Sequence, residues 1–254
     1  EPFQTTIANK QILDAEAELR VLNQTDGFDS AKTAYFHNAI TGYHAAKPAG
    51  MQDLFDFHVY NGNLSVFNML NVKYVVREDE EGNKFPIENP NANGNSWFVK
   101  NLVQVTSADE EIRALDSLDT KQNAVVNTKK FNNINRFDYQ VDSTASIRLT
   151  NYEPNQLTYT SSNSNAGVTV FSEMYYGHGW NATIDGKAAE HFKANYVLRA
   201  MLVPSGNHEI VFKFEPTIIN TGNTITLISY AFLLLIPIGW FFIDKKKNVQ
   251  STTE

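Results

Sequence analysis

The sequence predicts an α+β N-terminal part followed by an antiparallel β-sandwich and then one C-terminal transmembrane helix. Three observations predict this order: mixed helical and strand patterns before residue 130, apolar alternation with period two after it, and an uncharged apolar stretch at residues 224–243. We therefore expect a mixed α/β domain at 1–130 and a sandwich at 131–222. A membrane helix at 223–243 and a tail at 244–254 complete the predicted domains.

The first part mixes short helical and strand signals. Residues 12–22 look helical at their start and strand-like at their end, and residues 72–76 and 97–105 read as strands. Apolar residues between 52 and 69 recur at helical spacings. Ser107 and Glu110 form a capping-box pattern at the start of a short helix.

The second part alternates between apolar and polar residues from about residue 134. Short apolar runs at 147–149, 157–161, 168–172, 197–203 and 208–214 are separated by glycine- and asparagine-containing turns. Such spacing is typical of an antiparallel sandwich. Asp185-Gly186 follows residues 180–184, and this dipeptide predicts a type I′ hairpin turn.

The apolar stretch at 224–243 contains twenty residues and no charge. A helix of that length spans about 30 Å, the thickness of the hydrocarbon layer. The alternative is a buried core helix, but 10–14 apolar residues is the more usual length there. Three lysines at 245–247 mark the following tail as cytoplasmic, so residues 1–222 are expected outside the cytoplasm.

The composition excludes several partners and chemistries. The chain has 21 basic and 28 acidic residues, a net charge of −7, and the part before residue 223 carries about −8. That charge argues against nucleic acid and against docking on anionic lipid. Because the sequence contains no cysteine, disulfide bonds and thiolate chemistry are excluded. The absence of cysteine is compatible with a bacterial envelope protein.

The chain begins with Glu1-Pro2-Phe3 and shows no leading hydrophobic segment. Since residues 1–222 must cross the membrane, we expect the C-terminal piece of a longer protein with earlier membrane helices as partners. The alternative is a trimmed signal peptide, which would leave a single-pass anchored domain.

One loop combines aromatic, basic and acidic side chains in the way that sugar or phosphate sites do. The candidate substrate-binding residues are Tyr43, His44, Lys47, Gln52 and Asp53. Aromatic faces stack on sugar C–H surfaces, and the polar groups hydrogen-bond hydroxyls or phosphate. The alternative is a packed loop whose polar groups satisfy one another.

Two further candidates lie elsewhere in the sequence. Lys73 either faces a ligand or is the solvent side of an edge strand. Trp180, in a glycine-rich segment, either stacks on a sugar or belongs to the sandwich core. The six histidines show no metal-motif spacing, and no nucleophile elbow, phosphate loop or dinucleotide fingerprint occurs. We therefore predict no metal, no cofactor and no catalytic residue, although a hydrolase built on His44 and Asp53 stays open.

Several blocks together resemble the C-terminal region of the bacterial YfhO-type membrane proteins. They are GYHAAKP, QDLFDFH, NMLNVKYVV, NPNANGNSWFV, YYGHGWNATIDGK and NYVLRAMLVPSGNHEIVFKFEP, followed by the final hydrophobic helix. The asparagine-rich loop at 89–95 is similar to that of Bacteroidetes members.

The resemblance implies a multi-spanning protein of the bacterial cytoplasmic (inner) membrane, similar to the GT-C class of glycosyltransferases. Such enzymes take sugars from polyprenyl-phosphate donors, and here the acceptor would be an envelope polysaccharide. Their catalytic carboxylate lies in the first outer loop of the whole protein, so no catalytic residue carries over.

Two functions follow. The first is an outer domain accessory to a lipid-linked-sugar glycosyltransferase, inactive by itself. The second is a single-pass, non-enzymatic sandwich module that binds glycan or protein. Hydrophobic spans in the upstream coding sequence would favour the first.

Overall fold

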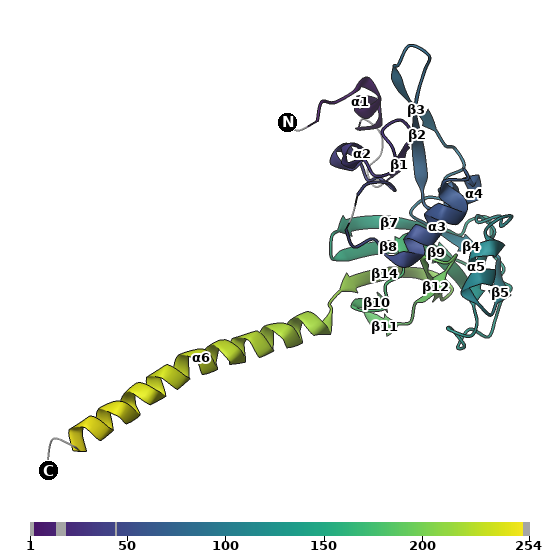
Figure 1. The fold of residues 1–254 in the computed structure, drawn as a ribbon. Coiled ribbons are helices and arrows are strands. Elements are labelled where there is room, and N and C mark those ends of the chain that lie inside the picture. Colours follow the sequence, from purple (N-terminus) through teal and green to yellow (C-terminus); the bar gives the residue numbers. More distant parts are fainter. Residues whose placement is uncertain (1–2, 14–18, 44, 251–254) are drawn as a thin grey trace. The chain divides into compact units, whose positions relative to one another are not determined.

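The structure, a computed structural model, describes residues 3–13, 19–43 and 45–250 (Figure 1). Small helices and strands come first, antiparallel sheets follow, and one long apolar helix comes last, which confirms the predicted fold class. The chain divides into two compact units, one of Glu1–Tyr176 with Asn181–Lys213 and one of Gly177–Trp180 with Phe214–Glu254. The sequence-based boundary at residue 130 remains a prediction.

The helices of the first unit are short. They are α1 (Ile7–Leu13), α2 (Ala31–Phe36), α3 (Ala49–Leu54), the π-helical turn η1 (Phe55–Val59), α4 (Leu64–Met69) and α5 (Ala108–Ala114). The predicted cap of α5 is confirmed, because the Ser107 hydroxyl accepts a hydrogen bond from the Glu110 N–H at 3.2 Å. The Glu110 carboxylate accepts from the Thr106 N–H at 2.8 Å, one residue before the cap.

Two antiparallel sheets form the sandwich. The five-stranded sheet has the order β11-β10-β14-β8-β7, with β7 (Ser146–Glu153), β8 (Gln156–Asn163), β10 (Trp180–Ile184), β11 (Lys187–Ala189) and β14 (Gly206–Phe214). The four-stranded sheet has the order β12-β13-β9-β4, with β4 (Ser96–Val99), β9 (Gly167–Met174), β12 (Phe192–Ala194) and β13 (Leu198–Val203).

Two smaller sheets belong to the part of the chain before residue 128. One joins β1 (Arg20–Asn23), β2 (Val72–Glu78) and β3 (Lys84–Glu88), and the other pairs β5 (Asn101–Val105) with β6 (Asn123–Asn127). The β1–β2 and β5–β6 pairs are parallel, and β2–β3 is antiparallel.

Three aromatic rings fill the space between the two sandwich sheets. Tyr159 of β8 and Phe212 of β14 come from the five-stranded sheet, and Phe171 of β9 comes from the other. The ring centroid of Phe171 lies 4.8 Å from that of Tyr159 and 4.9 Å from that of Phe212, both edge to face. All three are fully buried, so this cluster is the contact through which the sheets pack.

Residues 97–105, predicted as one strand, form two strands in different sheets. β4 pairs with β9, and β5 pairs with β6. The change occurs at Lys100, whose N–H donates to the Gln122 carbonyl at 2.7 Å. The Trp97 indole donates to the Thr120 carbonyl at 2.8 Å, which holds the same two segments together. Sequence alternation does not show which partner strand supplies these bonds.

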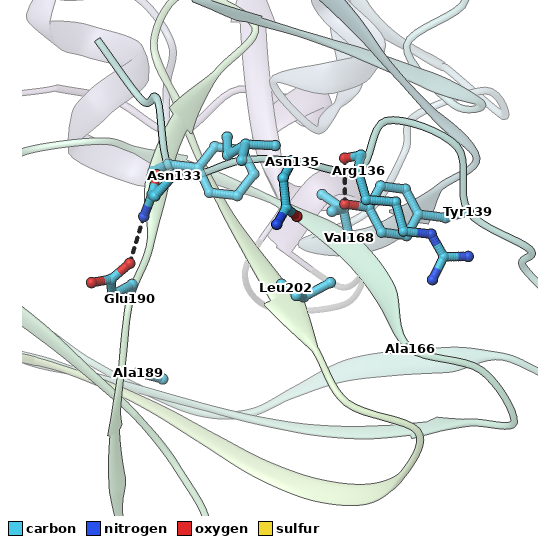
Figure 2. A pocket seen from close by; sticks show the side chains of 11 residues that line it. Asn133, Asn135, Arg136, Tyr139, Ala166, Val168, Ala189, Glu190 and Leu202 are labelled. Carbon is cyan, nitrogen blue, oxygen red and sulfur yellow. Dashed lines mark hydrogen bonds between the residues drawn. The ribbon is translucent and has the colours of Figure 1, made fainter. Parts of the chain in front are cut away.

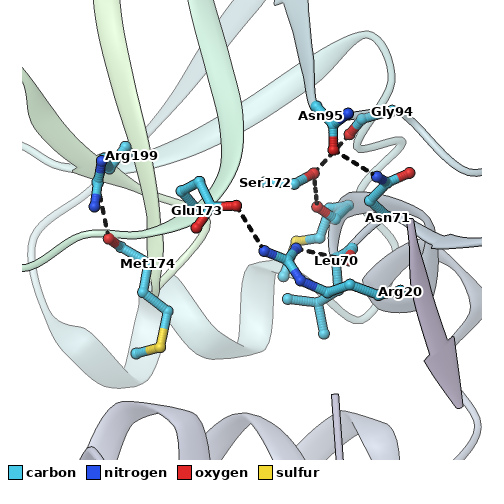
Figure 3. A network of polar contacts seen from close by, with 10 residues as sticks. Arg20, Leu70, Asn71, Gly94, Asn95, Ser172, Glu173, Met174 and Arg199 are labelled. Carbon is cyan, nitrogen blue, oxygen red and sulfur yellow. Dashed lines mark hydrogen bonds and ion pairs between the residues drawn. The ribbon is translucent and has the colours of Figure 1, made fainter. Parts of the chain in front are cut away.

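A polar network ties the small β1–β2–β3 sheet and its helices to β9 (Figure 3). The Arg20 guanidinium donates to the Leu70 carbonyl at 3.0 Å and pairs with the Glu173 carboxylate at 2.8 Å. The Ser172 hydroxyl lies 2.9 Å from the Met69 carbonyl and 2.7 Å from the Gly94 carbonyl. These contacts supply hydrogen-bond partners to backbone carbonyls at the C-terminal end of α4 and in the loop before β4.

The predicted β10–β11 hairpin is confirmed. Asp185 and Gly186 have φ values of 50° and 75°, the left-handed conformations that a type I′ turn requires. The Asp185 carboxylate accepts from the Glu209 N–H at 2.9 Å and contacts the His208 ring at 2.7 Å, which fixes the turn against β14.

The second unit contains helix α6 (Thr217–Gln250) and the segment that precedes it. The helix begins at Thr217, ahead of the membrane segment predicted at 223–243, whose bounds remain a prediction. Glu215 donates its N–H to the Gly179 carbonyl at 2.7 Å, and a Cβ at Gly179 would come within 2.9 Å of Phe214 and Pro216. Gly179 therefore permits a close approach that a larger residue would prevent.

The aromatic cluster generates a stability prediction. Phe171→Ala should lower the free energy of unfolding by about 3–5 kcal/mol, because it removes a fully buried ring and leaves a cavity. Urea unfolding of the purified chain measures this change. Phe85→Ala is the matched control, since Phe85 is 40% exposed on β3. An equal loss in both variants would contradict the role of the cluster.

Candidate functional site

Three of the predicted site residues lie close together around α3. The Lys47 ammonium is 5.1 Å from the centroid of the Phe55 ring, and Gln52 donates to the Asp56 carboxylate at 2.8 Å. Asp53 accepts a hydrogen bond from the Tyr196 hydroxyl at 2.7 Å. The polar groups of this predicted site therefore contact other residues of the protein.

Tyr43 and Lys73, the other described candidates of the first unit, take no part in these contacts. Tyr43 is 76% exposed, and His44 lies outside the described residues. Lys73 forms an ion pair with Glu88 at 2.9 Å across the β2–β3 hairpin. Trp180 belongs to the second unit, where its ring packs 5.3 Å from that of Phe214.

Tyr196 is the partner of Asp53 that sequence reasoning missed. It follows Asn195 between β12 and β13, and both residues have positive φ, 49° and 69°. The Asn195 side chain accepts from the Val125 N–H at 2.9 Å, and its own N–H donates to the Val125 carbonyl at 2.9 Å. This anchor holds the tyrosine in a conformation that costs about 1–2 kcal/mol for a residue with a Cβ.

A buried carboxylate supports the same turn from α5. Glu111 is fully buried; it accepts from the Tyr196 N–H at 3.2 Å and pairs with the Lys193 ammonium at 3.1 Å. The Lys193 ammonium also lies 4.7 Å from the centroid of the Tyr196 ring. We call Asp53, Glu111, Lys193 and Tyr196 the Asp53–Tyr196 cluster.

The electrostatics of this cluster favour a structural role. Burial, together with the Asp53 carboxylate, raises the pKa of Tyr196 to about 12, so the hydroxyl stays protonated and donates. Burial also raises the pKa of Glu111, against the opposing effect of Lys193. Glu111 has no solvent exposure and cannot reach a substrate, so it positions the turn that carries Tyr196.

A pocket of about 380 Å³ lies on the first unit, away from the predicted residues (Figure 2). Its lining contains both apolar and polar side chains. The apolar residues are Ile134, Ala166, Val168, Ala189, Phe192 and Leu202, and the polar or aromatic ones are Asn133, Asn135, Arg136, Tyr139 and Glu190.

Hydrogen bonds hold several of the polar lining residues in place. Asn133 donates to the Glu190 carboxylate, and the Tyr139 hydroxyl donates to the Arg136 carbonyl at 2.7 Å (Figure 2). The Arg136 guanidinium lies 5.0 Å from the centroid of the Tyr139 ring. Amide, guanidinium and carboxylate groups beside apolar side chains suit a ligand with hydroxyls and an apolar face, as sugars have.

Sequence reasoning did not identify this pocket. Its residues come from the loop at 133–139, the start of β9, the β11–β12 connection and β13. The asparagine- and aromatic-rich run at 131–139 is the sequence signal for this pocket, but the period-two alternation of the same region predicts strands alone. Among the described residues, no group of histidine and acidic side chains could hold a metal ion.

The apolar helix and the sheet-rich unit together define a class of protein. Of the described helices, α6 alone has a stretch, Thr217–Trp240, long and apolar enough to cross a bilayer. Its large apolar side chains, Leu233, Leu234 and Ile236 among them, are exposed. Such a surface is stable in lipid and not in water, so this is a membrane protein that carries a sheet-rich globular unit.

The comparison with protein families identifies the particular group. The family model described as bacterial membrane protein YfhO matches residues 83–226, more than half of the chain. The chain therefore belongs to the YfhO family, as the sequence blocks predicted. No protein of curated function matches it, and no solved structure does.

The buried carboxylate generates a pH prediction. Because burial raises the folded-state pKa of Glu111, the folded chain holds its proton more tightly than the unfolded chain. This contribution to stability is present below the unfolded pKa of about 4.5 and is lost as pH rises through the raised value.

Glu111→Gln should therefore flatten the decline in unfolding free energy just above pH 4.5, as measured by urea midpoints across pH. Glu110→Gln is the control, because hydrogen bonds from Thr106 lower the pKa of that exposed carboxyl. If Glu111→Gln left the slope of unfolding free energy against pH unchanged, the raised pKa assigned to Glu111 would be refuted.

Proposed function

We propose that this chain is the C-terminal extracytoplasmic region and last membrane helix of a multi-spanning YfhO protein. In this proposal it is accessory to the transfer of a sugar from a polyprenyl-phosphate donor to an acceptor of the cell envelope. Membership of the YfhO family is the observation that carries it. The apolar helix α6 and the lysines at 245–247 support the orientation with a cytoplasmic tail.

The pocket of Figure 2 is the proposed saccharide site of this region. Asn135 and Arg136 can donate to sugar hydroxyls, and Leu202 with Val168 offers an apolar surface. The loop with Tyr43, His44, Lys47, Gln52 and Asp53 stays a second, predicted contact, as do Lys73 and Trp180. The polar contacts of Gln52 and Asp53 with Asp56 and Tyr196 favour the pocket as the first site to test.

The second candidate is a single-pass module that binds glycan or protein without taking part in transfer. The pocket fits this function equally well, because binding requires no catalytic group. An assay of sugar transfer by the full-length gene product distinguishes the two candidate functions.

Transfer should depend on the pocket. In membranes that contain the full-length gene product and a polyprenyl-phosphate sugar, Asn135→Ala/Arg136→Ala should lower transfer to the acceptor at least about tenfold. Loss of a neutral and a charged hydrogen bond is worth about 2–4 kcal/mol. The measurement is incorporation of radiolabelled sugar.

Asn91→Ala/Arg113→Ala is the matched control, because both residues are exposed and neither lines the pocket. Unchanged transfer in the pocket variant would remove the pocket from the activity. Equal unfolding midpoints for the two variants would exclude misfolding as the cause of a loss.

The orientation can be tested by thiol labelling, because these 254 residues contain no cysteine. Glu80→Cys lies in the exposed turn between β2 and β3, and Asn248→Cys lies near the end of α6. In intact spheroplasts a membrane-impermeant maleimide should label position 80 and leave position 248 unlabelled. Permeabilised cells, in which both positions react, are the control; labelling of position 248 alone in intact cells would reverse the proposed topology.

A further inference from the structure

A polar groove crosses the outer face of the five-stranded sheet and continues past its β7 edge. Its edge part has a volume of about 580 Å³ and its sheet part about 460 Å³. Ser146 and Arg148 of β7 line both parts, so the two parts adjoin at this strand. This groove shares no lining residue with the pocket of Figure 2.

The edge part of the groove gathers positive charge on an acidic chain. Lys100, Lys121 and Arg148 line it, although the whole chain carries −7. In the described part of the chain, none of the three forms an ion pair. The Lys121 ammonium donates to the Asn93 carbonyl at 3.0 Å, and that bond leaves two of its protons for a ligand.

One carboxylate, Asp142, lines the same part of the groove, and the loop occupies its oxygens. One oxygen accepts from the Thr144 N–H at 2.8 Å, and the other accepts from the Ser164 N–H at 2.9 Å. A hydrogen bond from the Thr144 hydroxyl at 2.6 Å, together with these two, holds the pKa of Asp142 well below its usual range. Asp142 is therefore an anion whose oxygens already have donors. Three cations against one engaged carboxylate leave the edge part positive.

The sheet part of the groove offers hydroxyl and amide groups in register. Strand pairing places side chains from three adjacent strands in two rows, each about 10 Å across. The rows are Ser146–Ser162–Asn207 and Arg148–Thr160–Glu209. Arg148 belongs both to one of these rows and to the three cations of the edge part. A ligand can therefore place an anionic group at the cations and its hydroxyls along the rows.

We propose that the groove binds an anionic saccharide, with its phosphate at Lys100, Lys121 and Arg148 and its hydroxyls on the rows of β7, β8 and β14. Lysine and arginine bind phosphate through charge-assisted hydrogen bonds, and Ser, Thr and Asn both donate to and accept from sugar hydroxyls. The inference goes beyond the proposed transfer role, because this binding needs no reaction and no other membrane helix.

Calorimetric titration of the 254-residue chain in zwitterionic micelles tests this inference. The probes are glucose 1-phosphate, glucose, inorganic phosphate and vesicles that contain phosphatidylglycerol. Glucose 1-phosphate should bind more tightly than glucose and more tightly than inorganic phosphate. Lys100→Gln/Arg148→Gln should weaken its binding at least tenfold, and Thr160→Val should weaken glucose 1-phosphate while leaving inorganic phosphate unchanged.

The matched control is Lys10→Gln/Lys187→Gln, which changes the net charge equally at exposed residues outside the groove. The affinity of this control variant for glucose 1-phosphate should stay within about twofold of that of the unmodified chain. Equal losses in both double variants, or no binding of glucose 1-phosphate at millimolar concentration, would overturn the proposal. Inorganic phosphate or vesicles bound as tightly as the sugar phosphate would overturn its saccharide part. Failure of the transfer assay leaves these binding results unaffected.

Discussion

The sheet-rich unit depends on the burial of strand β9. Residues from Gly167 to Ser172 are buried without interruption, so this strand has protein on both faces. Phe171 packs against the rings of the opposite sheet, and Val168 and Val170 join the core cluster that includes residues of α4 and β2. Ser172 and Glu173 bind the backbone near α4 and the side chain of Arg20. One strand therefore fixes the sandwich and the N-terminal helices to each other.

That constraint also places the candidate binding surfaces. The pocket of Figure 2 uses the start of β9 and the neighbouring β13, whereas the polar groove uses the outer face of the opposite sheet. Rigid strands hold both sets of side chains, and loops contribute Asn133, Arg136 and Glu190. Sites on strands keep their geometry because backbone pairing restricts them, on both sides for β8, β9, β13 and β14 and on one side for the edge strand β7. The Asp53–Tyr196 cluster serves the same end by fixing α3 against the β12–β13 turn.

Local patterns predicted local structure well. The Asp185-Gly186 turn, the Ser107 cap and the apolar helix could each be recognised, because turn geometry, capping and bilayer thickness act within a few residues or one segment. Partner strands could not be predicted: nothing local tells residues 97–99 to pair with β9 and residues 101–105 with β6. The contacts of the candidate site were the hardest to predict, because Asp53 and its hydrogen-bond partner Tyr196 are 143 residues apart in the sequence. The groove likewise depends on the register of three strands.

The central claim is that the globular unit of this YfhO protein binds saccharide when the protein is in its native membrane. Photo-crosslinking of the full-length gene product in native membranes, with a diazirine-bearing polyprenyl-phosphate sugar, tests it most directly. Mass spectrometry should map crosslinks to residues 133–139 and 189–192 or to β7 and β8, and unlabelled donor should compete with them. Competable crosslinks that fall wholly outside residues 1–222 would contradict the claim.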